Sequence, residues 1–336
     1  MEADAWGMLR VCVQAPEWME PWLDRFYDRS DRELVLSLRD RPQEPAEVRE
    51  SLGCRQADLV RAWQRGVLAW SADDRLSPAD FHVRFDHWAM FDGWKDLPQA
   101  IKDRLNRWEL GQYAAAHAGE VEALRSGLPP QAERIIPRYL LLEESLEIID
   151  LAEQVFLWPC NCRSMLGTCS KPVFTCLRFD NARGLGWEIS REKAKDLIQE
   201  ANRAGLMQSG ELALDAEGRL AGAICNCCSD CCFPHLLAEA VQAEKLWPKT
   251  RYLARINHDL CSGCGRCARR CPFQALTLTK AAQDETREVV LSGTICRGCG
   301  LCATGCPEQA INMHSLDLGP GWDMRRSEER RVGKEC

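Results

Sequence analysis

The sequence lacks several features that would assign it to a common functional class. No apolar run approaches the roughly 18 residues of a membrane-spanning helix. Residues 1–10 lack a basic segment followed by an apolar one, so we expect no export signal. The net charge of -7 argues against a general nucleic-acid binder, which needs positive charge to displace counterions. Glycine fingerprints for nucleotides, a P-loop and a Ser/His/Asp arrangement are also missing.

Cysteine is scarce in the first part of the chain and abundant after it. Of 20 cysteines in 336 residues, two precede residue 150, seventeen lie between Cys160 and Cys306, and one is the last residue. Clustered cysteines in a chain without an export signal favour metal binding over disulfides. We therefore predict a cytoplasmic metal-binding protein, and the length allows two or three domains with cores of their own.

The pattern of apolar residues predicts an α+β multidomain fold. Residues 1–118, with eight of the 12 tryptophans, predict a helical, winged-helix-like domain. We expect three helices, at residues 30–38, 45–52 and 55–65, and then a strand at 66–70, which is the order of elements in a winged helix. A further helix is expected at 98–117. Gly53 is expected to end the second helix. Residues 119–135 predict a linker, because Leu128-Pro129-Pro130 interrupts the helical pattern.

Residues 136–250 predict a cysteine-rich α+β middle domain. We expect helices at 140–156 and at 190–204, the second capped by Ser190, and a hairpin formed by 211–214 and 220–224. Residues 251–325 contain an internal repeat of about 25 residues, which predicts a third domain.

The last eleven residues, 326–336, read RSEERRVGKEC. This string resembles the in-frame translation of a common sequencing adapter, so we exclude it from the fold prediction. We expect the natural gene to continue past Arg325, and a natural basic tail is the alternative.

Two four-cysteine runs, 35 residues apart, carry the strongest signal in the sequence. Each has the spacing Cys-x2-Cys-x2-Cys-x3-Cys-Pro, which is typical of 4Fe-4S binding. Glycines between the cysteines let the backbone pass close to the sulfides. Zinc would instead favour Cys-x2-Cys pairs about 15 to 20 residues apart.

Residues 251–314 resemble the bacterial dicluster ferredoxins. The resemblance implies a ferredoxin-like fold, with two short strand pairs and two small helices about a pseudo-twofold axis, and two 4Fe-4S clusters. The fourth cysteine of each run ligates the other cluster in such proteins. The first cluster is therefore expected to bind Cys261, Cys264, Cys267 and Cys306. The second is expected to bind Cys296, Cys299, Cys302 and Cys271.

Nine further cysteines predict a third metal site in the middle domain. Adjacent cysteines rarely bind one metal together, so the second half of this set is expected to split its ligands. Soft thiolates suit an iron-sulfur cluster first and zinc second, and a site without metal is the remaining alternative. The ligands are an undetermined subset of Cys160, Cys162, Cys169, Cys176, Cys225, Cys227, Cys228, Cys231 and Cys232.

Residues 136–314 also resemble a functionally uncharacterised family of 4Fe-4S binding proteins from anaerobic bacteria. The family pattern is P-C-x-C-R, a spaced cysteine, T-C-L-x-F, a helix, I-C-N-C-C-x-D-C-C and a dicluster domain. Here it is matched by Pro159–Arg163, Cys169, Thr175–Phe179, Gly184–Ser190 and Ile224–Cys232. The resemblance implies an iron-sulfur protein and names no substrate.

Together these patterns predict an iron-sulfur electron-transfer protein that exchanges single electrons with a partner oxidoreductase. Arginines beside the cluster cysteines predict a docking patch for an acidic partner, with a solvated helix face as the alternative: Arg266, Arg269, Arg270 and Arg297.

Two other functions stay open. One is a reductase with an open coordination position at the middle site. The other is a redox-sensing transcriptional regulator that would read DNA with Arg55, Gln56, Arg61 and Arg65. Residues 1–110 carry 16 Lys and Arg against 21 Asp and Glu, which argues against DNA binding.

Overall fold

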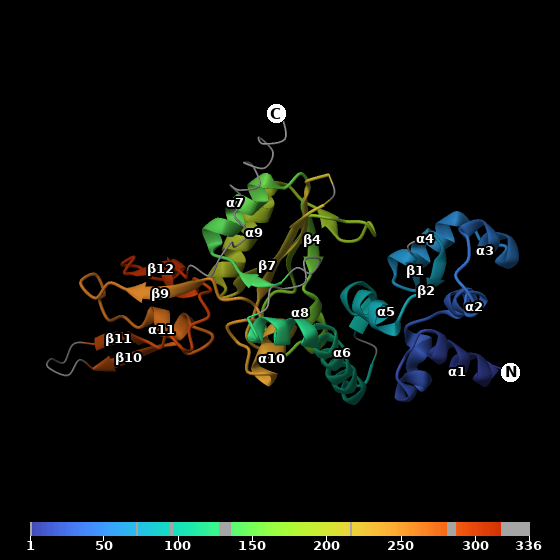
Figure 1. The fold of residues 1–336 in the computed structure, drawn as a ribbon, viewed down its shortest axis with the longest axis horizontal. Helices are drawn as coiled ribbons and strands as arrows, with labels where there is room; N and C mark the ends of the chain where they lie inside the picture. Colours follow the sequence, from blue (N-terminus) through green and yellow to red (C-terminus); the bar gives the residue numbers. More distant parts are fainter. Residues whose placement is uncertain are drawn as a thin grey trace.

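A computed structural model describes residues 2–71, 73–94, 97–127, 136–215, 217–280 and 287–316. Helices form one end of the molecule, a six-stranded sheet lies in the middle, and two small sheets form the other end (Figure 1). The mixture of helix and sheet confirms the α+β class. None of the helices in the described part of the chain is long and apolar enough to cross a membrane. The unusual residues 326–336 lie outside the described ranges.

The N-terminal part begins with two helices that the sequence did not predict, α1 (Glu2–Cys12) and the 3-10 helix η1 (Glu17–Arg25). The three expected helices follow, and then a hairpin: α2 (Arg29–Ser37), α3 (Pro45–Leu52), α4 (Gln56–Gln64), β1 (Leu68–Trp70) and β2 (Leu76–Pro78). Gly53 ends α3 in the left-handed conformation, as predicted. Phe26, Phe81 and Phe85 are buried in the core, against which six of the tryptophans pack while partly exposed.

Three helical segments connect this part to the middle of the molecule: α5 (Phe81–His87), η2 (Trp88–Gly93) and α6 (Gln99–Arg125). The helix expected to end at His117 continues to Arg125, so residues 119–125 of the predicted linker are helical. The extension contains good helix formers such as Ala and Glu, which continue the helix past Gly119, and the helix ends just before Gly127, whose φ is +70°. Residues 128–135 lie outside the described ranges, and the domain boundary at 118 stays a prediction.

The middle part is an antiparallel sheet with the strand order β3-β7-β8-β5-β4-β6. Its elements are β3 (Arg138–Tyr139), α7 (Leu142–Leu151), β4 (Phe156–Pro159), α8 (Asn161–Leu166), β5 (Phe174–Arg178), β6 (Trp187–Glu188), α9 (Arg191–Arg203), β7 (Met207–Leu214), β8 (Leu220–Cys227) and α10 (Phe233–Ala240). The Ser190 side chain accepts a hydrogen bond from the Lys193 amide and caps α9, as predicted. The expected helix 140–156 is shorter, because the chain turns at buried Ala152 and Phe156 begins a strand.

Helices α7 and α9 cover one face of this sheet (Figure 1). Leu177 of β5 and Ile224 of β8 point toward these helices and are fully buried in their core. Successive side chains of a strand point to opposite faces. Cys176 and Cys225, the neighbours of those two residues, therefore lie on the other face.

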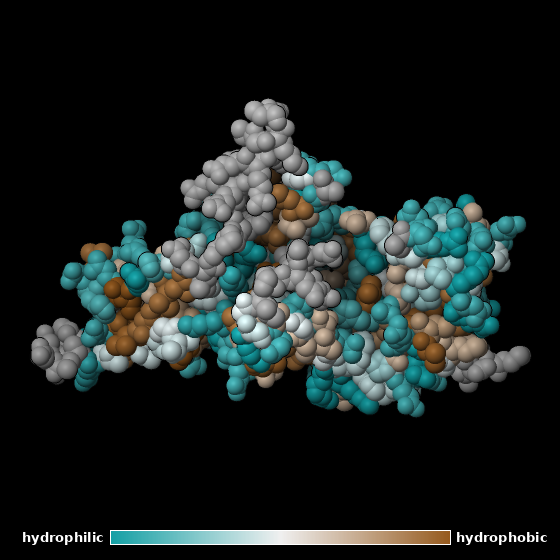
Figure 2. Space-filling model, viewed as in Figure 1, coloured by the Kyte–Doolittle hydropathy of each residue, from teal (hydrophilic) through white to brown (hydrophobic). Residues whose placement is uncertain are grey.

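The C-terminal part has the two strand pairs and two short helices that the resemblance to dicluster ferredoxins implied. In sequence order these are β9 (Tyr252–Ile256), α11 (Arg266–Arg270), β10 (Leu276–Lys280), β11 (Arg287–Leu291), α12 (Leu301–Thr304) and β12 (Ile311–Ser315). Strand β9 pairs with β12 and β10 pairs with β11, so each sheet joins the two repeats. Figure 2 shows a mostly hydrophilic face with a hydrophobic area over this part, at the left.

Candidate metal centres

The eight cysteines of the two C-terminal runs surround two cavities of nearly equal volume. Cys261, Cys264, Cys267 and Cys306 line a cavity of about 330 Å³. A second cavity, of about 320 Å³, is lined by Cys271, Cys296, Cys299 and Cys302. Each cavity thus combines three cysteines of one run with the last cysteine of the other. Four thiols facing one space form a donor set that fits an iron-sulfur cluster.

The backbone around these cavities repeats the pseudo-twofold symmetry. The Cys271 sulfur accepts a hydrogen bond from the Ala275 amide at 3.3 Å, and the Cys306 sulfur accepts one from Ala310 at the same distance. Amide hydrogen bonds to sulfur are one of the factors that set cluster potentials. Burial raises the pKa of Cys299 to about 12. A protonated thiol must lose its proton to bind metal, so metal binding there releases protons.

The nine cysteines of the middle domain fall into two separate groups. One, the six-cysteine group, lies on the sheet face opposite α7 and α9 and includes Cys160, Cys162, Cys176, Cys225, Cys227 and Cys232. The other, the three-cysteine group, contains Cys169, Cys228 and Cys231. Both adjacent pairs, Cys227-Cys228 and Cys231-Cys232, are divided between the groups. Which of these cysteines bind metal stays a prediction.

The six-cysteine group forms a continuous series of thiols. Neighbouring thiols shift one another's pKa along the series: Cys160 with Cys176, Cys176 with Cys225, Cys225 with Cys227, and Cys232 with both Cys227 and Cys162. The neighbouring Cys176 thiol and burial hold the pKa of Cys160 well above its usual value. Strands β5 and β8 and the first residues of α8 and α10 position these thiols. Six sulfurs exceed the four that one 4Fe-4S cluster binds.

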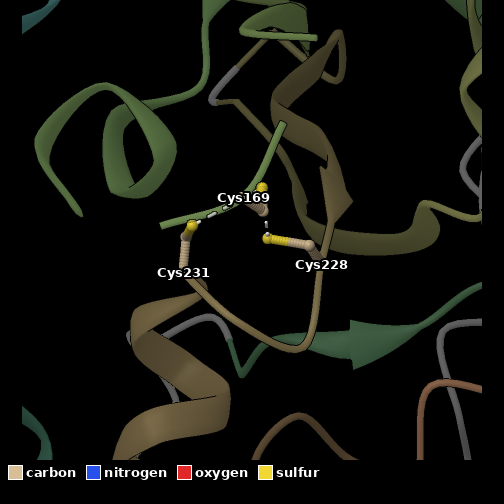
Figure 3. Close-up of side chains that lie close together, drawn as sticks. All are labelled: Cys169, Cys228 and Cys231. Atoms are coloured by element: carbon tan, nitrogen blue, oxygen red, sulfur yellow. Dashed lines mark hydrogen bonds between the residues drawn. The ribbon is translucent and has the colours of Figure 1, made fainter. Parts of the chain in front are cut away.

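The three-cysteine group is more compact and lies beyond the end of β8 (Figure 3). The Cys169 sulfur is 3.7 Å from that of Cys228 and 3.6 Å from that of Cys231. The three thiols pack with Ala201 and Leu206, at the C-terminal end of α9. Sequence reasoning did not separate these three cysteines from the other six.

A buried arginine, which the sequence analysis did not single out as a site residue, lies between the two groups. Arg163 is 2% exposed and donates to the carbonyl oxygens of Pro172 and Asn226 at 2.5 and 2.7 Å. Burial lowers its pKa, but the neighbouring Cys160 and Cys228 sulfurs outweigh this and raise it above the usual value. The guanidinium therefore stays charged, and its charge helps to lower the pKa of Cys228.

An apolar contact joins the second C-terminal cavity to the six-cysteine group. Cys299 packs in the same buried cluster as Cys227 and Cys232, together with Tyr139 and Leu301. The Tyr139 hydroxyl lies 2.9 Å from His235 Nε2, and the His235 ring stacks on Phe273. Burial lowers the pKa of His235 to about 4, so its ring is neutral at neutral pH. The space between the two thiol sets is thus filled by neutral side chains.

The four arginines beside the cluster cysteines do not form one free docking patch. Arg270 donates to the backbone oxygens of Leu301 and Arg203 and to the Asn202 side chain, which fixes the C-terminal part against α9. Arg297 is 12% exposed on its side chain, pairs with Glu244 at 3.7 Å and lies over the Phe273 ring. Arg269 also donates to the Cys264 carbonyl oxygen at 3.4 Å, so three of the four arginines make contacts within the chain.

A titratable cluster of the N-terminal part touches the loop that carries Cys160 and Cys162. His82 Nδ1 is 2.8 Å from Glu109 Oε1, and Asn161 donates to Asp86 Oδ1 at 3.1 Å. The hydrogen bond to Glu109 raises the pKa of His82 to about 9. Burial and the Glu109 charge raise the pKa of Asp86 to about 7.

Replacing Asp86 with asparagine is expected to stabilise the protein at alkaline pH. A carboxyl whose pKa rises from 3.8 to about 7 on folding favours the folded state at low pH, and this contribution is lost as the pH rises through 7. Asparagine keeps an oxygen that accepts from Asn161 but carries no charge to bury. The advantage of the variant should grow by about 1 to 2 kcal/mol between pH 5 and pH 8. Anaerobic thermal unfolding at a series of pH values measures this. A variant that is less stable than the wild type at pH 8 contradicts it.

Comparison with known proteins agrees with the geometry of the C-terminal part. Residues 254–313 match a family model described as a 4Fe-4S dicluster domain. The match supports iron-sulfur binding and a role in electron transfer. No curated protein matches the chain. The wider family resemblance suggested by the middle cysteines stays a prediction.

Proposed function

We propose that this chain is an iron-sulfur electron-transfer protein with three redox centres, two in the C-terminal domain and one at the six-cysteine group. The packing of Cys299, Cys227 and Cys232 in one buried cluster, with Tyr139 near all three, carries the proposal. Cys261, Cys264, Cys267 and Cys306 would hold the first 4Fe-4S cluster, and Cys296, Cys299, Cys302 and Cys271 the second. Four of the six middle cysteines would hold the third. When bound, such clusters supply one-electron transfer.

The residues between the second and third sites would exclude water and fix the spacing of the two sites. Tyr139 is 1% exposed and Leu301 is fully buried. Burial and the Cys299 thiol hold the pKa of Tyr139 well above its usual range, so the phenol stays neutral. A dry and uncharged contact has little polar solvation to reorganise when the charge of a neighbouring site changes.

The first 4Fe-4S site, at the other end of the proposed series of three redox centres, supports electron exchange with a partner protein. Cys264 of the first site is exposed, so this site reaches the surface. Leu260 and Ile295, which precede the first cysteine of each run, are 54% and 43% exposed. Exposed apolar side chains beside a redox site suit a short-lived contact with a partner oxidoreductase. The partner and a cytoplasmic location stay predictions.

Iron counting tests the proposal directly. The wild-type protein, purified without oxygen, should contain about twelve irons and twelve sulfides, since each 4Fe-4S cluster holds four of each. The Cys227→Ser, Cys232→Ser double variant should lose about a third of its iron and keep the EPR signals of the C-terminal clusters. Cys54→Ser, at a thiol that packs on the N-terminal core, is the control. A wild-type count of about eight irons contradicts the third cluster.

A regulatory function has one structural observation in its favour. Gln43, between α2 and α3, pairs with Leu76 of β2 and adds a third strand position beside the β1-β2 hairpin. The hairpin itself follows helices α2, α3 and α4. This connectivity supports a winged-helix domain. Two of the expected DNA-reading side chains are occupied, because Arg65 pairs with Asp31 at 3.0 Å and Arg55 with Asp58 at 3.0 Å. We therefore propose a protein-binding role for this domain rather than DNA binding.

A further inference from the structure

The three-cysteine group has the dimensions of a single-ion site. Zinc-sulfur bonds of about 2.3 Å at tetrahedral angles place the sulfurs about 3.8 Å apart. The sulfur separations of 3.7 and 3.6 Å between Cys169 and its two neighbours agree with this length, and all three sulfurs lie within 4.8 Å of one another. In Figure 3 the three side chains converge on one point from two loops.

The C-terminal cysteines provide an internal comparison. There, the four thiols that line one cavity do not all lie within 4.8 Å of one another, which suits a cubane in which each thiolate binds a different iron. Cys169, Cys228 and Cys231 instead approach one another to hydrogen-bonding distance. Their spacing suits one metal ion rather than a cluster of four irons.

The local backbone supports binding of an ion by thiolates. Cys228-Ser229-Asp230-Cys231 lies between β8 and α10 and has the Cys-x2-Cys spacing that is typical of zinc ligands. Three thiolates and a divalent ion leave one net negative charge, and Arg163 beside Cys228 supplies one positive charge.

We propose that Cys169, Cys228 and Cys231 bind one tetrahedral zinc ion, separate from the six-cysteine group. Within the described residues the group offers three ligand atoms, so the fourth position falls to water or a small ligand. The ion would join the loop after α8 to the turn between β8 and α10, next to the C-terminal end of α9. This site does not depend on the third iron-sulfur cluster.

Metal analysis of the full-length protein, purified without oxygen, tests the site. We expect one zinc per chain in the wild type. Cys169→Ser and Cys231→Ser should each reduce zinc at least fivefold and leave the iron content unchanged. The matched control is Cys176→Ser, in the six-cysteine group, which should keep its zinc. A wild type without zinc overturns the proposal, and so does loss of about four irons in Cys231→Ser.

Cobalt substitution covers the case in which the serine variants fail to fold. Wild-type protein produced with Co²⁺ in place of zinc should show the intense visible bands of tetrahedral cobalt and sulfur-to-cobalt charge transfer. Absence of both from cobalt-containing protein overturns the proposal. The two proposals also fail separately: eight irons with one zinc removes the third cluster alone, and twelve irons without zinc removes the zinc site alone.

Discussion

Gly298→Ala is expected to prevent assembly of the second C-terminal metal centre. Gly298 lies between Arg297 and Cys299 with a φ of +72°, a conformation that alanine adopts only with strain. An added Cβ would lie 2.1 Å from the Tyr252 carbonyl oxygen and 2.8 Å from its carbonyl carbon. Both atoms belong to the backbone at the start of β9, so no side-chain rotation relieves the contact. Either β9 or the cysteine loop must move.

We expect the variant to lose about 3 to 5 kcal/mol of its free energy of unfolding, because backbone strain and overpacking both destabilise the folded state. A domain this small depends on its metal centres for folding, so the iron content should fall at least by the four irons of the second site. The symmetry-related Gly263→Ala should behave in the same way, because its Cβ would meet the Arg287 carbonyl oxygen at 2.3 Å.

Gly293→Ala is the matched control for this experiment. Gly293 has an ordinary φ, and its Cβ would meet the Leu253 side chain at 3.9 Å, an ordinary contact. Iron content and thermal unfolding of the three variants should be compared under anaerobic conditions. Equal iron in Gly298→Ala and Gly293→Ala would show that the loop tolerates the added carbon.

The C-terminal part could be predicted from the sequence because its determinants are local. The spacing of each cysteine run, its glycines and its final proline lie within about a dozen residues, and the second run repeats them. The positive φ angles of Gln274 and Gln309, at equivalent positions after the two prolines, show how closely the repeats agree. The same reasoning placed α3 and α9, whose ends are marked by Gly53 and Ser190.

The middle domain could be predicted only in part, because its two cysteine groups depend on strand pairing. Cys176 and Cys225 meet because β5 pairs with β8 across about 50 residues, with Leu177 opposite Ile224. The sequence contains no signal for that register. Adjacent cysteines did indicate that ligands would be divided, since neighbouring residues cannot easily face the same ion. Which thiol joins which group follows from the end of β8, where Cys227 is the last strand residue and Cys228 begins the turn.

Arg163→Met is expected to have the second large effect, on both cysteine groups of the middle domain at once. Besides its two backbone acceptors, the guanidinium donates to Thr175 Oγ1 at 3.2 Å. Methionine fills a similar volume but has no donor, which leaves the Pro172 and Asn226 carbonyl oxygens unpaired. It also removes the buried positive charge that faces the thiolates. Removing one partner from a buried, charged hydrogen-bond network lowers the free energy of unfolding by about 3 to 5 kcal/mol.

The metal content separates this effect from a general loss of folding. Arg163→Met should lose zinc and about a third of the iron, while the C-terminal clusters, held by other residues, keep their EPR signals. Arg163→Lys should fall between the variant and the wild type, because lysine keeps the charge but cannot span the same acceptors. Arg219→Met, at a side chain that is 54% exposed, should leave the unfolding temperature close to that of the wild type. The prediction is wrong if Arg163→Met unfolds at the same temperature as Arg219→Met and retains its metals. In that case the cysteine groups do not need this cation, and neutral thiols or amide hydrogen bonds must keep their charge low instead.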